Sequence, residues 1–362
     1  QYYLGKIFYE GEGIPKDIDK AIHYLQLSAD QDNPNAEFKL GEIYYEGKYV
    51  RRDVNKAINL IKRAADINNY SIAQCELGKI YYEGFYIARD INKAMYYYHL
   101  SSEQNYSIAQ YHLGLIYYEG KYISRDIDKA IYYFQLASDD NLTSAQYNLG
   151  KIYMDGEYVS RNIDKAIYYF TLASNHNSYV SQHALGLIYF EGKYVKYNIS
   201  KAIDYFSKAA KFYKNAQFML GIIYLLGADV EKDIKKGIYY LSQSANNGFQ
   251  EAQFIMAYFY QEGKLVQKDI KKAIKLYKEV SSFNNQFAKN NLGVIYKSVF
   301  EDDVKQNVGL SIEYFKEAIC QKNDNLAKFN LSIVYLYDEP FKNSIDESIN
   351  LLIDLIDTEI KS

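Results

Sequence analysis

The sequence contains very little cysteine, histidine or tryptophan: two cysteines, five histidines and no tryptophan in 362 residues. Cys75 and Cys320 are far apart and neither belongs to a closely spaced pair, so the chain has neither a disulfide framework nor the ligand spacing of a zinc site. The histidines are scattered, and no two of them form an H-x-x-x-H pair on a helix. We therefore expect no metal and no cofactor.

An excess of one charge and a long apolar run are also missing. Lys and Arg number 42 against 45 Asp and Glu, a formal net charge of −3. This balance argues against a nucleic-acid or anionic-membrane binder, because such proteins carry a strong basic excess. No run of about 18 apolar residues is present to span a bilayer, and the chain begins without Met and without the apolar stretch of a signal peptide. These features favour a soluble, cytoplasmic protein, and we expect the sequence to be a piece of a longer one.

What the sequence does have is 42 tyrosines and an internal repeat. A Leu-Gly pair followed three positions later by an aromatic residue, usually Tyr, recurs at intervals of 36, 37, 36, 36, 36, 35, 36, 36 and 39 residues. In two weaker copies Ala or Ser replaces the glycine. The position is occupied by Gly5, Gly41, Gly78, Gly114, Gly150, Gly186, Gly221, Ala257, Gly293 and Ser332.

A chain of this length ordinarily forms two domains, but a period that fills the sequence predicts a single repeat array over residues 1–362. The first repeat is partial and the last two are degenerate. The approximate repeat limits are 1–33, 34–70, 71–106, 107–142, 143–178, 179–213, 214–249, 250–285, 286–324 and 325–362.

Each repeat has the pattern of two helices. In the second repeat, Ala36, Leu40 and Tyr44 recur at the helical spacing and form one apolar stripe. Gly47 is expected to end that helix, because glycine adopts the left-handed backbone conformation at little cost. Asp53 is expected to cap the helix that follows. The glycine of the Leu-Gly pair lets the two helix axes approach closely. The pattern predicts an all-α solenoid of about ten antiparallel helix pairs.

The junctions between repeats contain Asn, Asp or Gly, which tolerate the left-handed conformation at a helix end. Two residues later, Ser or Thr is expected to cap the next helix. Asn69, Asn105 and Asn141 also begin N-x-S/T sequons, so N-glycosylation is an alternative to the capping interpretation that we favour. The junction residues are Asp32, Asn69, Asn105, Asn141, Asn177, Gly248, Asn284 and Asn323.

The string A-x-x-x-L-G-x-x-Y-x-x-G, a loop with Asp, and then K-A followed by aromatic residues resembles the Sel-one-like repeats, a tetratricopeptide-like class. Repeats one to eight match this string, whereas the ninth and tenth lack the K-A pair and have Val299 and Asp338 in place of the helix-ending glycine. Tyrosine replaces the family's tryptophan in the second helix. The resemblance implies a right-handed α-solenoid. The fourth repeat matches at Ala109, Leu113, Gly114, Tyr117, Gly120, Asp126, Lys129, Ala130, Tyr133 and Phe134.

The resemblance also implies a function. Sel-one-like proteins typically act as adaptors in signalling, membrane-protein degradation or cell-wall synthesis, so we expect a non-catalytic scaffold that binds other proteins or peptides along a concave surface. An alternative is the regulatory region of a larger enzyme, such as a kinase or a cell-wall synthase activator, whose catalytic part lies outside this chain. No catalytic constellation is evident: the repeated Asp is a helix cap, and Cys75 is expected to be a buried apolar residue.

The best candidates for partner binding lie one residue beyond the core tyrosine of the first helix. Aromatic residues and Met supply contact area at a modest ordering cost and are typical of binding hot spots, and two lysines one turn earlier are expected to form a cationic rim. The alternative is closer packing between neighbouring first helices. The candidate residues are Tyr45, Tyr82, Tyr118, Met154 and Phe190, with Lys79 and Lys151.

Two further side-chain series have structural interpretations. Tyr96, Tyr132, Tyr168 and Tyr239 on the second helices either form an exposed contact surface or, as we favour, pack against loop tyrosines such as Tyr122 and Tyr158. The glutamates before the loop glycines are expected to form solvated ion pairs with loop arginines. Those arginines are Arg52, Arg89, Arg125 and Arg161.

Overall fold

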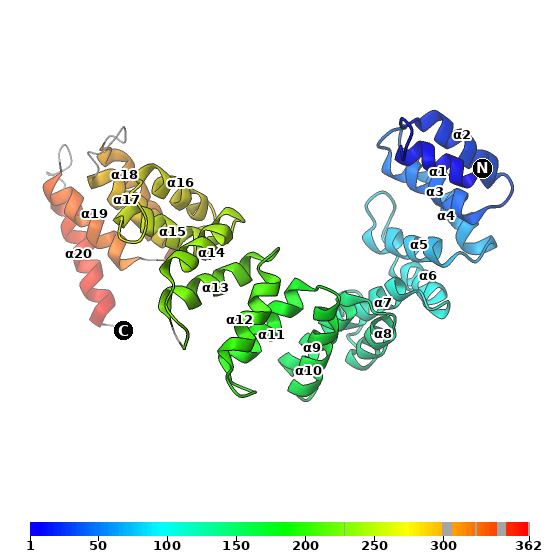
Figure 1. Cartoon of the computed structure of the whole chain (residues 1–362). Helices are drawn as coiled ribbons and strands as arrows, with labels where there is room; N and C mark the ends of the chain where they lie inside the picture. Colours follow the sequence, from blue (N-terminus) through cyan, green and yellow to red (C-terminus); the bar gives the residue numbers. More distant parts are fainter. Residues whose placement is uncertain (228, 299–305, 323, 339–344, 361–362) are drawn as a thin grey trace. The chain divides into compact units, whose positions relative to one another are not determined.

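The computed structural model describes residues 1–227, 229–298, 306–322, 324–338 and 345–360. The chain divides into two compact units, residues 1–182 and 183–362. Within the described ranges it forms twenty α-helices and one π-helical turn, with no strand (Figure 1). The predicted all-α fold of helix pairs is confirmed.

The first unit contains five helix pairs, and each of the first four pairs also packs on the next. A π-helical turn, η1 (Arg63–Ile67), continues α4. The helices are α1 (Tyr2–Glu10), α2 (Ile18–Ala29), α3 (Pro34–Glu46), α4 (Val54–Lys62), α5 (Ser71–Glu83), α6 (Ile91–Glu103), α7 (Ser107–Glu119), α8 (Ile127–Asp139), α9 (Thr143–Asp155) and α10 (Ile163–Asn175).

The next helix, α11 (Tyr179–Glu191), begins in the first unit and ends in the second. In the second unit, α13 to α20 form four pairs, and α12 packs on α13. The helices are α12 (Ile199–Ala209), α13 (Lys214–Leu226), α14 (Ile234–Asn246), α15 (Gln250–Glu262), α16 (Ile270–Ser281), α17 (Gln286–Ser298), α18 (Val308–Lys322), α19 (Asn325–Tyr337) and α20 (Ile345–Ile360).

The glycine of each Leu-Gly pair lies where the second helix of the repeat presses against the first. A Cβ atom on Gly114 would lie 2.5 Å from the Phe134 ring, and one on Gly78 would lie 2.7 Å from the Tyr98 ring. Both rings are buried. The position therefore accepts no ordinary side chain unless the ring moves, which confirms the close approach that the sequence predicts.

The helix ends follow the predicted signals. Gly47, Gly84, Gly120 and Gly156 end first helices in the left-handed conformation, with φ between 61° and 68°. At the start of α8, the carboxylate of Asp126 accepts a hydrogen bond from the Lys129 amide at 3.0 Å. The same cap is formed by Asp17, Asp53, Asp90, Asn162, Asn198, Asp233 and Asp269.

The junctions agree with only part of the prediction. Asn69, Asn105 and Asn141 have positive φ angles, of 48°, 59° and 60°, as expected for left-handed residues. However, Ser71 does not cap α5: it is the first residue of that helix, and Tyr70 lies at the cap with no side-chain bond. The same correction holds for Ser107 and Thr143. The expected junction residue Asn323 lies outside the described residues.

Stacked tyrosines connect the two helices of most repeats. In the fourth repeat, the rings of Tyr117 and Tyr133 are 5.8 Å apart and nearly parallel, and the Lys129 ammonium group lies 5.1 Å from the Tyr117 ring centre. The Tyr that replaces the family's Trp thus stacks on the core Tyr, and the Lys of the K-A pair covers that ring. The other stacks are Tyr81–Tyr97, Tyr153–Tyr169, Tyr189–Tyr205, Tyr224–Tyr240 and Tyr296–Tyr314.

The 37-residue interval between Gly41 and Gly78 has a structural cause. The second helix of this repeat ends in the π-helical turn η1, which accommodates one extra residue without breaking the helix. This turn carries Arg63, whose guanidinium group lies 2.9 Å from the carboxylate of Glu37 and 3.0 Å from that of Asp32.

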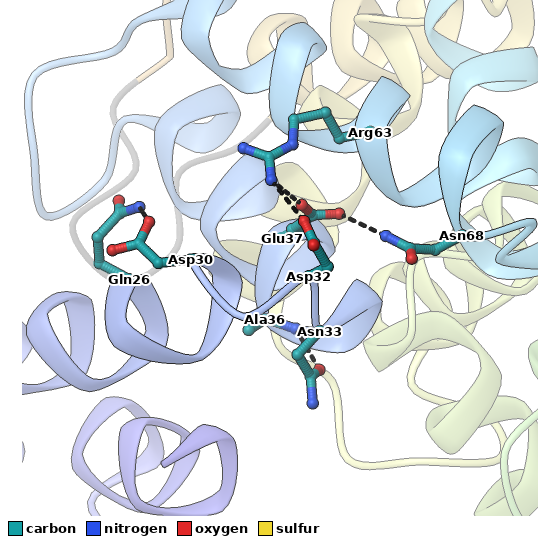
Figure 2. A network of polar contacts seen from close by, with 8 residues as sticks. All are labelled: Gln26, Asp30, Asp32, Asn33, Ala36, Glu37, Arg63 and Asn68. Carbon is teal, nitrogen blue, oxygen red and sulfur yellow. Dashed lines mark hydrogen bonds and ion pairs between the residues drawn. The ribbon is translucent and has the colours of Figure 1, made fainter.

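Figure 2 shows Glu37 in contact with both Arg63 and Asn68 in this network. The Glu37 side chain is 0% exposed, and Asn68 donates a hydrogen bond to it at 3.0 Å. Repeats three to eight have Gln here; Gln217, for example, donates to the Ala210 carbonyl at 2.7 Å. Glutamate cannot donate when ionised. Burial raises the pKa of Glu37, and Arg63 opposes that shift.

The two degenerate repeats keep the helix pairing. α17 packs on α18, and α19 packs on α20. α19 ends at Asp338 with an extended backbone, φ −100° and ψ 125°, rather than in the left-handed conformation of the glycine-ended helices. Val299, the other residue that replaces a helix-ending glycine, lies outside the described residues.

Candidate protein-binding surface

The predicted stripe occupies one position on successive first helices. Tyr45, Tyr82, Tyr118 and Met154 lie near the ends of α3, α5, α7 and α9 in the first unit, and all four are half-buried. We call the surface that these four helices form the first-helix face. Phe190 holds the same position on α11; it is also half-buried and contacts Phe206 edge-to-face at 6.4 Å.

Each tyrosine of the stripe packs against the loop of the following repeat. Tyr82 meets Tyr122 edge-to-face at 5.8 Å. Tyr45–Tyr86 and Tyr118–Tyr158 repeat this contact at 5.3 Å and 6.5 Å. The loop residues Tyr86, Tyr122 and Tyr158 therefore pack on the first helices. Because the stripe residues are half-buried, they contribute to packing between repeats and also to the surface.

The loop arginines cap the first helices by donating to backbone carbonyl oxygens. Arg89 donates to the carbonyl oxygens of Tyr82 at 2.8 Å and Glu83 at 3.0 Å, where the helix leaves acceptors unpaired. Its guanidinium group also lies 4.9 Å from the Tyr122 ring centre. Arg52 and Arg125 make equivalent backbone contacts. Within the described residues none of these three arginines forms the expected ion pair with a loop glutamate, because the carbonyl oxygens hold the guanidinium group in place.

The two lysines of the predicted cationic rim, Lys79 and Lys151, lie in different surroundings. Lys79 on α5 forms an ion pair with Glu76, with the ammonium nitrogen 3.4 Å from the carboxylate. Lys151 is exposed on α9. The ion pair offsets the positive charge of Lys79, so that this lysine does not present a cationic edge by itself.

Lys79 and Tyr82 line a cavity of about 420 Å³ between α5 and α7. This volume is in the range of known ligand pockets, roughly 300–1,000 Å³. Tyr98 and Tyr106 add two more aromatic rings. The remaining lining residues are Ile72, Cys75, Glu76, Glu83, Ile108, His112, Leu115, Ile116 and Glu119.

Burial sets the protonation of the ionisable groups in this cavity. It lowers the pKa of His112 to about 4, with the nearby Lys79 adding to the effect, so the imidazole is neutral at pH 7. Burial raises the pKa of Cys75 to about 12, which keeps the thiol protonated and unreactive. It also raises the pKa of Glu76, and Lys79 opposes that shift.

The tyrosines of the second helices do not pack as we favoured. Tyr96, Tyr132, Tyr168 and Tyr239 are 56–58% exposed. Each contacts the following tyrosine edge-to-face, as Tyr132 does with Tyr133 at 5.1 Å. The loop tyrosines are occupied by the first helices, so the preferred interpretation is wrong.

Within the described residues, no cluster of three or more His, Cys, Asp or Glu could hold a metal ion. No helix in the same part of the chain has both the length and the apolar character needed to cross a membrane.

Comparison with known proteins agrees with this architecture. The Sel1 repeat matches residues 1–33, 34–69, 71–106, 107–142, 143–178, 180–211, 214–249, 250–279 and 287–323. The chain belongs to the Sel1 repeat family. A search of curated proteins found no match.

Two solved Sel1-type structures are similar to the chain. One is a protective antigen of uropathogenic Escherichia coli, with TM-score 0.70 and 26% identity over 98% of this chain and 75% of the antigen. The other is a Sel1 repeat protein from Oxalobacter formigenes, with TM-score 0.70 and 26% identity over 84% of this chain and 89% of that protein. Sel1 repeat proteins generally serve as protein-interaction scaffolds, and the fold is typically non-catalytic.

Reasoning from the Sel1 pattern identified Lys79 and Tyr82 but missed the cavity around them. The sequence predicts Glu83 and Glu119 in ion pairs of the loops, Cys75 as a buried apolar residue and His112 as an ordinary residue of a helix face. The available signal was their spacing: Cys75, Lys79 and Tyr82 lie three or four residues apart on one helix face, as do His112, Leu115 and Glu119.

Proposed function

We propose that this Sel1 repeat chain is a non-catalytic scaffold that binds a segment of another protein on its first-helix face. The observation that carries this proposal is the cavity between α5 and α7, which contains Lys79 and Tyr82 together with two further tyrosines. A concave site with apolar walls and a few polar groups is the usual form of a binding pocket.

The rest of the stripe supports a longer contact. Tyr45, Tyr118 and Met154 are half-buried on neighbouring first helices, so part of each side chain is fixed by packing. An aromatic side chain that is already held in place loses little conformational entropy when a partner binds. Lys151 adds a charge that can orient the segment, and Phe190 is the corresponding residue of α11.

The chemistry of the cavity argues against a cysteine nucleophile. A reactive cysteine needs a lowered pKa and a charged or basic neighbour. Burial shifts Cys75 in the opposite direction, to a pKa of about 12, and the pKa of about 4 at His112 makes it a weak base. We therefore propose binding without catalysis.

The proposal can be tested by affinity capture with two double variants. Tyr82→Ala with Tyr118→Ala removes two rings of the first-helix face, and Tyr96→Ala with Tyr132→Ala removes two exposed rings of the second helices as a matched control. Both must first show the helical circular dichroism of the wild type and a Tm well above the assay temperature. We expect quantitative mass spectrometry to show partners lost from the first variant and kept by the second. The proposal is wrong if the folded Tyr82, Tyr118 variant captures the same partners at the same strength.

A further inference from the structure

The cavity between α5 and α7 is lined by three carboxylates, those of Glu76, Glu83 and Glu119, and by the ammonium group of Lys79. Glu83 and Glu119 line it from the two helices. In the described part of the chain, neither forms an ion pair, although Glu119 accepts a hydrogen bond from the Tyr82 hydroxyl at 3.3 Å. Two carboxylates at the edge of a partly enclosed site attract a cation more strongly than they would on an open surface.

The basic groups near the cavity are already engaged. Lys79 is paired with Glu76 at 3.4 Å. Arg89 donates to the carbonyl oxygens of Tyr82 and Glu83 and to the Tyr122 hydroxyl. The half-buried imidazole of His112 stacks on Tyr98, with the ring centres 5.0 Å apart. The side chains that line the cavity therefore carry more negative than positive charge.

Three tyrosine rings make the cavity suitable for a cation with an apolar stem. Tyr82, Tyr98 and Tyr106 line it together with Ile72 and Leu115. Cations are attracted to the faces of aromatic rings. Elsewhere in the first unit the protein packs its own cations in this way: Arg125 lies 4.7 Å from the Tyr158 ring centre and Lys129 lies 5.1 Å from that of Tyr117.

We infer that this cavity receives an arginine or lysine side chain of the bound protein segment. The inference rests on the proposed function, that the first-helix face binds such a segment, and adds the chemistry of one of its residues. The cationic head contacts the carboxylates of Glu83 and Glu119, while the methylene stem lies along the tyrosine rings and Leu115.

The inference assigns this cation to a single place on the face. At the equivalent positions, α3 carries Lys39 and Glu46, α5 carries Glu76 and Glu83, α7 carries His112 and Glu119, and α9 carries Asn148 and Asp155. The α3 and α5 positions therefore include a lysine, and the α7 and α9 positions include one carboxylate fewer than those of α5 and α7. A bound segment should show one strongly preferred basic position rather than a general preference for basic residues.

The experiment is a selection from a random 12-residue peptide library displayed on phage, with the purified full chain as bait. Two double variants are used in parallel. Glu83→Gln with Glu119→Gln removes the two charges but keeps a hydrogen-bond acceptor for Tyr82. Asp128→Asn with Asp164→Asn removes the same charge from exposed positions on α8 and α10. All three proteins are compared by Tm before selection.

We expect the wild type and the Asp128, Asp164 variant to enrich peptides with one fixed Arg or Lys beside apolar or aromatic residues. Replacing that residue by Ala in a synthetic peptide should weaken binding about tenfold or more, as for a desolvated hot-spot contact. In the Glu83, Glu119 variant, the same peptide substitution should change the affinity less than twofold.

Each other result contradicts a defined part of the idea. Enriched peptides without a fixed basic residue would overturn the cationic site but leave the binding face intact. A fixed basic residue that the Glu83, Glu119 variant still requires would place the cation elsewhere and would also overturn the inference. If the wild type enriches no peptide, segment binding itself fails, and the inference fails with it.

Discussion

At the scale of single residues, the most informative positions are those where one repeat differs from the others. Gly114 and the corresponding glycines face a large side chain of the paired helix, yet Ala257 occupies the same repeat position and lies in one buried cluster with Tyr277. The site therefore accepts one methyl group when the surrounding helices adjust. Glu37 is a second exception, because it places a carboxyl group where repeats three to eight bury an amide.

Gly114→Val should lower the free energy of unfolding by roughly 1–3 kcal/mol, since overpacking forces the Phe134 ring out of place. A Cβ atom alone would lie 2.5 Å from that ring. Urea denaturation followed by circular dichroism measures the change. Gly114→Ala is the control and should be milder, as the natural Ala257 indicates. Adding Phe134→Leu should recover part of the loss, because Leu241 occupies this place opposite Gly221. An unchanged Tm for Gly114→Val would count against the contact.

Glu37→Gln should change how stability depends on pH. Burial raises the pKa of Glu37 above its ordinary value of 4.5, so the folded state binds the proton more tightly than the unfolded state. The wild type should therefore lose stability relative to the variant as the pH rises above about 4.5 through the raised pKa. Urea titrations at several pH values between 4.5 and 7 would measure the difference.

Asp139 is an exposed residue on α8, and Asp139→Asn provides a comparison for the Glu37 variant. This control should show little change in the pH dependence. A constant difference in stability between wild type and Glu37→Gln across the range would show that burial does not shift this carboxyl group.

At the scale of the helices, the ends are determined by short-range chemistry. Asn162 caps α10 by accepting a hydrogen bond from the Lys165 amide at 3.0 Å. At the other end of the preceding helix, Gly156 adopts the left-handed conformation, and the Arg161 side chain donates to the Met154 carbonyl at 2.9 Å. Each loop thus ends one helix and begins the next through contacts within a few residues.

Asn162→Ala should lower the free energy of unfolding by about 1 kcal/mol, the typical cost of a lost helix cap. Asn162→Asp keeps an acceptor at the same place and should retain most of that stability, since Asp126 forms the same cap on α8. Thermal unfolding of the two variants side by side is sufficient. Equal losses in both would mean that the side-chain acceptor is not what stabilises the start of α10.

At the scale of the whole molecule, the principal contacts within each unit join successive helices. Stability in such arrays is approximately a sum of repeat terms and nearest-neighbour terms. The tyrosines provide many of the neighbour terms: within a repeat they stack in parallel, and between repeats they meet edge-to-face, as Tyr117–Tyr133 and Tyr82–Tyr122 do.

A local destabilisation should therefore remain local. In the Gly114→Val variant, amide hydrogen exchange is expected to accelerate most in α7 and α8, less in α5, α6, α9 and α10, and least in α17 and α18. Mass-spectrometric exchange on peptic fragments can resolve these segments. A uniform acceleration along the chain would instead indicate that the described repeats unfold as one cooperative body.

The features that could be predicted from the amino-acid sequence are those that depend on contacts within one repeat. The 36-residue period, the helix-ending Gly47, the capping Asp126 and the close approach at Gly114 all follow from residue types within one repeat, because backbone conformation and helix pairing are short-range effects. Tyr82 and Lys79 were recognised in the same way, from their recurring position.

The side-chain contacts between neighbouring repeats could be seen only in the three-dimensional structure. The contact of Tyr82 with Tyr122, the packing of Glu83 and Glu119 around one cavity, and the exposure of Tyr132 join or separate residues from different helices. Ring and charge contacts of this kind depend on the rotation and offset between helix pairs. Those quantities arise from side-chain packing over the whole interface, and no periodicity in the sequence encodes them.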